Sequence, residues 1–217
     1  MDHLFEDNNI TKLRGDAMEV VPTLGTFDIL LTDPPYPVGG TSSLKSVGSV
    51  TDTRLMIDGM FLSFFMQVFR AIKKQDKFQC WIFTDWRQVS FLSNCLRLEG
   101  LDKQSVIVWD KCNGSLSALY SPQHELILYA SNFSIKKYLG PDIRQFKRPK
   151  KSIKTNPFQK PVDLVVDICK PFEGGNKKMI DPFAGSGSLL TAASQLGWHA
   201  TGIDINEIAK QKREWRG

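Results

Sequence analysis

Residues 27–36 read FDILLTDPPY, an apolar run that ends in an acid, two prolines and an aromatic ring. The almost unbroken apolar character of residues 27–32 is typical of a strand buried on both faces of a parallel sheet. At its end Asp33 is placed to accept hydrogen bonds, and Pro34 presents a carbonyl oxygen without a competing N–H group. Tyr36 adds a flat apolar face. These residues are therefore suited to hold the planar amine of an aromatic base at the carboxyl edge of a sheet.

A second motif, DPFAGSGS at residues 181–188, stands near the other end of the chain. A short expected strand at 178–180 precedes it, and a helical pattern at 188–196 follows it. Its glycines permit a tight turn and let a ligand approach the backbone closely. In dinucleotide-binding folds such a turn aims helix N–H groups at a pyrophosphate. The third glycine of that fingerprint is replaced here by Leu190, which favours a smaller cofactor.

A carboxylate follows the next expected strand, residues 199–203. Asp204 stands at its end, 17 residues after Gly187. In nucleotide-binding folds an acid at this place accepts hydrogen bonds from ribose hydroxyls. The alternative is a helix N-cap, because Asn206 and Glu207 follow. The strand, the spacing and the preceding turn together favour the ribose interpretation.

Apolar periodicity predicts one doubly wound α/β domain over residues 1–217, with a mostly parallel, seven-stranded sheet. Strands are expected at 10–14, 27–32, 78–84, 105–109, 125–130, 178–180 and 199–203. Helices are expected at 17–24, 60–72, 88–98, 162–169, 188–196 and 206–215. Residues 37–58, rich in glycine, serine and threonine, are expected to form a mobile loop after the first motif.

The net charge of +5 is concentrated in one part of the chain. Residues 136–154 hold eight basic residues and one acid, a charge of +7, so that the remainder carries −2. Such a segment predicts contact with a phosphate backbone, and a solvated surface loop is the alternative. The expected DNA-binding residues are Lys136, Lys137, Arg144, Lys147, Arg148, Lys150, Lys151 and Lys154.

Other features of the sequence exclude several classes of protein. The chain has no apolar stretch long enough to span a membrane, and residues 1–7 are acidic, unlike a signal peptide. The four cysteines are widely spaced without a CxxC pair, which predicts reduced thiols in a cytoplasmic protein. His124 has no second histidine at metal-ligand spacing, so we expect no metal site.

Taken together, these motifs resemble the β-class amino-methyltransferases, the DNA methylases that act on exocyclic amines. In this family a DPPY block comes first and an FxGxG block last, the order of residues 33–36 and 183–187 here. Further matches are Gly15-Asp16, the sequence VWDK at 108–111, His124-Glu125, and QKP at 159–161. The resemblance implies a Rossmann-like methyltransferase sheet with circularly permuted motif order and a terminal antiparallel strand pair.

The resemblance also implies S-adenosyl-L-methionine as cofactor and a role for each matching position. Phe183 to Ser188 would wrap the methionine part, Asp204 would bind the ribose, Asp16 the adenine amino group, and Lys160 and Pro161 would lie near the methionine end. The full expected cofactor set is Asp16, Ala17, Asp33, Lys160, Pro161, Asp181, Phe183, Ala184, Gly185, Ser186, Gly187, Ser188, Asp204 and Ile205. The expected catalytic residues, which would hold the target base, are Asp33, Pro34, Pro35 and Tyr36.

The implied function is methylation of the N6 amine of adenine in DNA, either at a specific site or with low specificity. An aspartate that opens the tetrapeptide goes more often with adenine in this family, so cytosine-N4 methylation is the alternative. Ser188 and Asp204 stand where threonine and glutamate are common, and both substitutions keep a polar group. A larger departure is that the short basic segment 131–158 replaces a long target-recognition region. This leaves open a homodimer, a recognition partner, or an inactive or partner-dependent DNA-binding subunit.

Overall fold

A computed structural model describes residues 2–7, 9–35, 50–113, 120–149 and 159–205. The strands in these ranges are β1 (Asp2–Asp7), β2 (Ile10–Arg14), β3 (Thr26–Thr32), β4 (Lys73–Thr84), β5 (Lys103–Asp110), β6 (His124–Ser131), β7 (Ile143–Gln145), β8 (Lys178–Asp181) and β9 (His199–Asp204). The helices are α1 (Ala17–Val20), α2 (Val50–Ala71), α3 (Val89–Leu98), α4 (Val162–Cys169) and α5 (Ser188–Gln195). Two 3₁₀ turns, η1 (Val21–Thr23) and η2 (Lys170–Phe172), follow α1 and α4.

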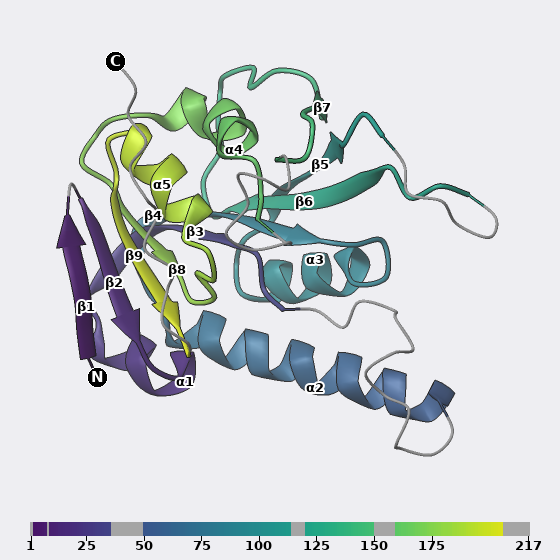
Figure 1. The fold of residues 1–217 in the computed structure, drawn as a ribbon, viewed down its shortest axis with the longest axis horizontal. Coiled ribbons are helices and arrows are strands. Elements are labelled where there is room, and N and C mark those ends of the chain that lie inside the picture. The colour runs from purple at the N-terminus through teal and green to yellow at the C-terminus, as the bar shows by residue number, and fades with distance from the viewer. Residues whose placement is uncertain (1, 8, 36–49, 114–119, 150–158, 206–217) are drawn as a thin grey trace.

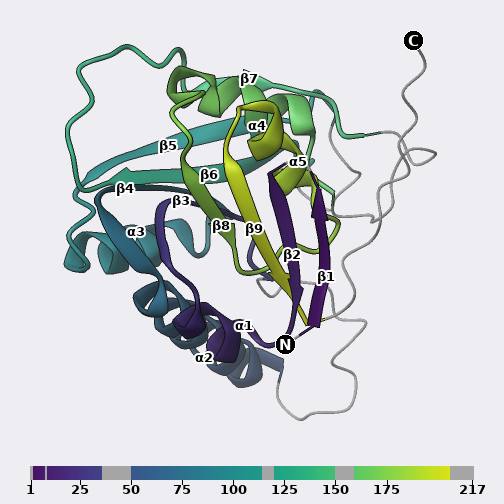
Figure 2. The same cartoon turned by 90° about the vertical axis from the view of Figure 1, so that its left-hand side faces the viewer.

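Over the described residues the strands form one mixed sheet with the order β1-β2-β9-β8-β3-β4-β6-β5-β7. Strands β2, β9, β8, β3 and β4 run parallel to one another, and β6 pairs antiparallel with both β4 and β5. Figure 2 shows β1, β2, β9 and β8 side by side. The predicted fold class, a mostly parallel methyltransferase-like α/β sheet, is confirmed.

Helices cover both faces of the sheet (Figure 1). Helices α1, α2 and α3 pack on one face, and α4 and α5 pack on the other. The central strand β3 shows why its sequence is almost wholly apolar. Leu30 belongs to the first core, while Ile29 and Leu31 belong to the second, and all three are fully buried. Burial of side chains on both faces of a strand requires apolar residues at successive positions.

All seven predicted strands are present, and the structure adds two at the edges of the sheet. β1 pairs antiparallel with β2, and β7 is a three-residue strand that pairs with the end of β5. Their sequences, DHLFED and IRQ, lack the apolar run or alternation that identifies a strand. Pairing with a neighbour, and not local pattern, therefore produces these two strands.

The predicted mobile loop at 37–58 is partly wrong. Residues 36–49 lie outside the described part, but α2 begins at Val50, so that residues 50–58 are helical. Residues 50–58 contain neither glycine nor proline, and Gly59, which separates them from the phenylalanine-rich segment, lies within the helix, where a single glycine costs only about 1 kcal/mol. The predicted terminal helix at 206–215 lies outside the described residues.

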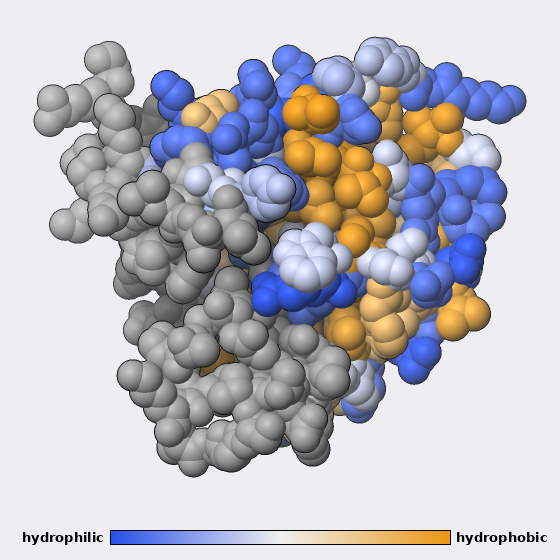
Figure 3. Space-filling view, turned by 90° about the vertical axis from the view of Figure 1, so that its right-hand side faces the viewer, coloured by the Kyte–Doolittle hydropathy of each residue, from blue (hydrophilic) through white to orange (hydrophobic). Residues whose placement is uncertain are grey.

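The surface is not uniformly polar. Figure 3 shows apolar side chains gathered on one side of the molecule, bordered by polar ones. Large hydrophobic side chains exposed among the described residues include Trp86, Phe91 and Val106. No helix in the described ranges is both long enough and apolar enough to cross a membrane.

Gly202 tests how closely the glycine-rich turn packs on β9. A Cβ atom at this position would overlap Leu190 and lie 2.9 Å from Cβ of Ala184. We expect Gly202→Ala to lower the free energy of unfolding by about 1–3 kcal/mol, because the packed interior has no room for an added methyl group. Chemical denaturation measures this loss. Gly25→Ala is the matched control, since a Cβ atom there meets nothing within 4 Å. Equal stability of the two variants would contradict the prediction.

Candidate active site

The two sequence motifs line a single cavity of about 730 Å³. Strands β3, β8 and β9 are parallel neighbours, so their carboxyl ends lie at the same edge of the sheet. Asp33 follows β3, Asp181 ends β8, and Asp204 ends β9. The cavity is lined by Gly15, Asp16, Ala17, Asp33, Pro34, Pro35, Phe64, Trp109, Glu125, Arg148, Gln159, Lys160, Asp181, Pro182, Phe183, Ala184, Gly185, Ser186, Ser188, Leu189, Asp204 and Ile205.

Asp33 forms an ion pair at the wall of this cavity. Its Oδ2 lies 3.0 Å from Nζ of Lys160, a buried residue just before α4. Burial raises the pKa of Asp33 above its usual value, and the charge and hydrogen bond of Lys160 act against that rise. Pro34 is buried and Pro35 is exposed. Tyr36, the last residue of the predicted catalytic set, lies outside the described residues.

The glycine-rich turn uses the left-handed backbone region at two positions. Gly185 has φ of 48° and Gly187 has φ of 76°, where a side chain would be strained. Gly187 is the N-cap residue of α5. The N–H of Gly185 donates a hydrogen bond of 2.9 Å to Oδ2 of Asp204. The turn and the acid at the end of β9 therefore hold each other in place.

One end of the cavity is formed by the segment between β2 and α1. Asp16 caps α1, accepting a hydrogen bond of 2.8 Å from the N–H of Met18. The N–H of Gly15 donates to the carbonyl oxygen of Asp204 at 3.0 Å. These bonds bring two predicted cofactor-binding acids, Asp16 and Asp204, to the same end of the cavity.

Asp181 is a fully buried carboxyl group at the cavity wall. Its Oδ1 accepts hydrogen bonds from the hydroxyl of Thr32 at 2.7 Å and from the N–H of Phe183 at 3.1 Å. Burial raises the pKa of Asp181 to about 7, while these hydrogen bonds oppose the rise and the charges of Asp33 and Asp204 add to it. The group therefore changes its charge near neutral pH in the folded protein.

The sequence interpretation missed several residues of the cavity. Phe64 was not among the predicted site residues, but it lines the cavity and the centre of its ring lies 5.9 Å from that of Phe183 on the glycine-rich turn. Glu125 was matched as part of a motif but given no role in the site, yet it lines the cavity and accepts hydrogen bonds from Lys160 and Lys111. The motif match at His124-Glu125 was the one signal of its position. Pro161 and Gly187, which were predicted to bind the cofactor, do not line the cavity.

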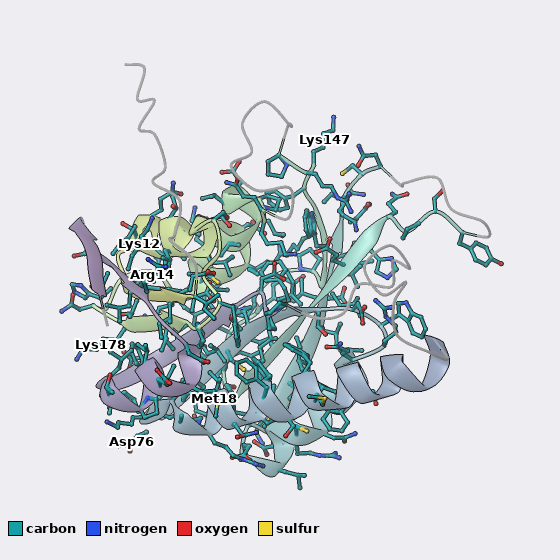
Figure 4. All side chains as sticks on the ribbon, turned by 60° about the horizontal axis from the view of Figure 1, so that its bottom comes forward. Lys12, Arg14, Met18, Asp76, Lys147 and Lys178 are labelled. Atoms are coloured by element: carbon teal, nitrogen blue, oxygen red, sulfur yellow. The ribbon has the colours of Figure 1, made fainter. Side chains whose placement is uncertain are left out.

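The predicted DNA-binding residues differ in their surroundings. Lys136, Lys137, Lys147 and Arg148 are exposed, and Figure 4 shows Lys147 at the outer edge of the molecule. Arg144 instead lies 3.2 Å from Oδ2 of Asp167 and donates to the carbonyl oxygen of Leu139. We therefore remove Arg144 from the set that we expect to contact phosphates. Lys150, Lys151 and Lys154 lie outside the described residues.

Comparison with known proteins finds relatives in sequence and in fold. Residues 141–212 match a family model described as DNA methylase, a range that contains the glycine-rich turn. The protein YubD of Escherichia coli (strain K12) is 28% identical over 201 residues, which cover 90% of this chain and 84% of YubD. The structure of an M1.HpyAVI–SAM complex has a TM-score of 0.68 and 21% identity, covering 91% of this chain and 94% of that chain. PvuII DNA methyltransferase (cytosine-N4-specific) has a TM-score of 0.64 and 15% identity, with coverage of 91% and 82%.

These matches agree with the motif-based resemblance. The solved structures share the fold, and the sequence relatives extend over most of the chain, including both motifs that line the cavity. The resemblance to S-adenosylmethionine-dependent DNA amino-methyltransferases is thus confirmed.

The raised pKa of Asp181 leads us to expect a specific pH dependence of the free energy of unfolding. Because its pKa is higher in the folded state than in the unfolded chain, the free energy of unfolding should fall as pH rises from about 4 to about 7. Asp181→Asn keeps the Oδ1 acceptor and removes the titration, so it should flatten this slope by up to about 1.4 kcal/mol per pH unit. Urea denaturation at pH 4.5 to 8 measures it. The exposed Asp76→Asn variant is the control, and an unchanged slope in Asp181→Asn would contradict the assignment.

Proposed function

We propose that the protein is a DNA methyltransferase that transfers a methyl group from S-adenosyl-L-methionine to the exocyclic N6 amine of adenine. One observation carries this proposal. The residues suited to hold an amine, Asp33 and Pro34, line the same cavity as the glycine-rich turn and Asp204. A methyl donor and a base amine placed in that cavity would meet at the carboxyl edge of the sheet, where ligands of open α/β folds bind.

The cavity suits S-adenosyl-L-methionine in size and in charge. Its volume lies within the roughly 300–1,000 Å³ typical of small-molecule sites. Asp204 and Asp16 would accept hydrogen bonds from the ribose and adenine parts, and the two residues share one end of the cavity. Asp33 and Asp181 offer negative charge to the cationic centres of the donor, and Lys160 offers a cation to its carboxylate. The turn at Gly185 would let the donor lie against the backbone.

When bound, S-adenosyl-L-methionine supplies a methyl group on a positively charged sulfur. The protein must then hold an amine nitrogen in line with that methyl group, so most of the catalysis is positioning and desolvation. The carboxylate of Asp33 would accept a hydrogen bond from the amine, as would the carbonyl oxygen of Pro34. Positive charge that develops on the nitrogen would be stabilised by Asp33 in its ionised form, until the amine proton that the methyl group replaces is lost to solvent. Tyr36 would stack on the base.

The DNA partner follows from the basic segment. A base can reach the cavity only if it leaves the duplex, which costs a few kcal/mol. Two exposed cations, Arg148 in the cavity lining and Lys147 next to it in the chain, are placed to bind the phosphates of such a distorted strand. We propose that the protein is cytoplasmic, of bacterial or phage type, and that its substrate is the DNA of that compartment.

The target base and the need for a partner have specific alternatives. The fold neighbour whose title reads cytosine-N4-specific keeps cytosine as the second candidate. Mass analysis of nucleosides from treated plasmid DNA distinguishes N6-methyladenine from N4-methylcytosine. The short recognition segment also permits a subunit that is inactive alone or acts with a second copy or a recognition partner. Activity of the purified chain on generic duplex DNA would exclude an inactive subunit and the need for a different recognition partner.

The first test removes the proposed catalytic carboxylate. We expect Asp33→Ala to lower transfer of a radiolabelled methyl group by at least about 100-fold, because the amine loses its charged acceptor. Cofactor affinity, measured by calorimetry, should change far less. The control is Asp76→Ala, on the exposed surface. Turnover by Asp33→Ala at the rate of the control would rule out the mechanism.

The second test concerns the phosphate contacts. Changing Lys147, Arg148, Lys150 and Lys151 to glutamine should weaken DNA binding and flatten its dependence on salt. Each lost contact lowers the slope of log K against log salt by about 0.9. A matched variant changes four exposed lysines elsewhere on the protein, Lys77, Lys103, Lys170 and Lys178, and should leave that slope unaltered. Identical slopes for both variants would contradict the phosphate contacts and favour the alternative interpretation of the basic segment as a solvated surface loop.

A further inference from the structure

Four charged residues form a continuous chain from the interior to the cavity wall. Glu125 stands between two ammonium groups: its Oε2 lies 3.0 Å from Nζ of Lys160, and its Oε1 lies 3.3 Å from Nζ of Lys111. Lys160 in turn lies 3.0 Å from Oδ2 of Asp33. The charges therefore alternate in the order Lys111, Glu125, Lys160, Asp33. One lysine is shared between the carboxylate proposed for catalysis and a second carboxylate.

The strand register explains how Glu125 reaches this place. β5 and β6 are antiparallel, and Glu125 in β6 is opposite Trp109, another residue of the cavity wall. Lys111 comes just after β5, and its N–H donates to the carbonyl oxygen of Gln123 at 2.9 Å. Glu125 is thus the second residue of β6, and it projects from a regular strand beside the cavity.

Burial makes each link of this chain matter. The side chains of Lys111 and Lys160 are only 4% and 8% exposed, and a buried cation is costly without a partner. Burial by itself would raise the pKa of Glu125, but the charges and hydrogen bonds of Lys160 and Lys111 outweigh it and lower that pKa. Glu125 is therefore a fixed anion near neutral pH.

We infer that Glu125 is a positioning residue for methyl transfer, which sets how strongly Lys160 holds Asp33. This inference rests on the proposed function of Asp33. If Lys160 faced Asp33 alone, its whole charge would bind that carboxylate and compete with the base amine. Sharing the ammonium group with Glu125 weakens that hold, while Lys160 still keeps Asp33 oriented. Glu125 would therefore act through Lys160, without touching the base.

The other charged groups around Asp33 define what a test must separate. Lys160 and Glu125 act directly on the pKa of Asp33, and Asp181 lies near enough for mutual repulsion. Lys111 acts through Glu125, and the half-exposed Arg148 lies 3.9 Å from Oε1 of Glu125. Of these, Lys111 and Glu125 are the two that our mechanism does not place on the donor, the base or the DNA.

Two variants should therefore move the pH dependence in opposite directions. Glu125→Gln removes an anion and leaves Lys160 to Asp33, so the pKa of Asp33 should fall and the acid limb of the kcat profile should move to lower pH by roughly 0.5 to 1 unit. Lys111→Gln leaves Glu125 to draw on Lys160, so the acid limb should move to higher pH. Glu99→Gln, in the surface pair with Arg70, is the control and should leave the profile in place.

A second measurement gives the same answer without turnover. The γ-carboxyl carbon signal of Asp33 can be followed by ¹³C NMR as pH changes, with Asp33→Asn used to assign it. Opposite displacements of this titration in Glu125→Gln and Lys111→Gln would support the inference, even in a chain that is inactive alone. Displacements that are absent or equal in direction would overturn it, whatever the activity. If Glu125→Gln fails to fold, the direction of the Lys111→Gln displacement decides. If the unaltered chain transfers no methyl group while the two titrations move as expected, the result counts against the proposed function and not against this inference.

Discussion

The hydrogen bond that Thr32 donates to Asp181 joins two parts of the chain that are 149 positions apart. It forms because β3 and β8 are parallel neighbours, which places the ends of both strands at one edge of the sheet. Asp33 follows the donor directly, and the glycine-rich turn follows the acceptor. The whole cavity depends on this alignment, since a shift of either strand by one residue would turn the alternating side chains to the opposite face.

The cost of this arrangement is a concentration of acids at one edge. Asp33, Asp181 and Asp204 lie at the ends of neighbouring strands, and burial, with a smaller contribution from the charges of Asp33 and Asp204, raises the pKa of Asp181 to about 7. A cationic donor would relieve that repulsion when it binds, because positive charge would enter a site held open by packing. The chain of Lys160, Glu125 and Lys111 shows the protein's own compensation on the other side of the cavity.

The sequence allowed prediction of whatever depends on local pattern. β3 was identifiable because burial on both faces demands successive apolar residues, and the glycine-rich turn because only glycine adopts its backbone angles without strain. Edge strands β1 and β7 were missed because pairing alone defines them. Side-chain contacts were missed for the same reason. Arg144 was assigned to DNA although it forms an ion pair with Asp167. Glu125 accepts hydrogen bonds from lysines that are 14 and 35 positions away in the sequence. Such contacts are fixed by topology, which no local pattern reports.

Both halves of the site are held rigidly, and this bears on the proposed chemistry. On the donor side, Gly185 is tied to Asp204, and Phe183 is packed against two phenylalanines of α2. On the base side, Pro34 is buried, its ring fixes its φ angle, and Pro35 after it restricts its ψ angle, which limits the direction of the Pro34 carbonyl oxygen. A reaction that needs only the alignment of a nucleophile with a methyl group gains most from rigidity on both sides. A general base at Asp33 would instead have to take up a proton, which the ammonium group of Lys160, 3.0 Å from Oδ2 of Asp33, opposes.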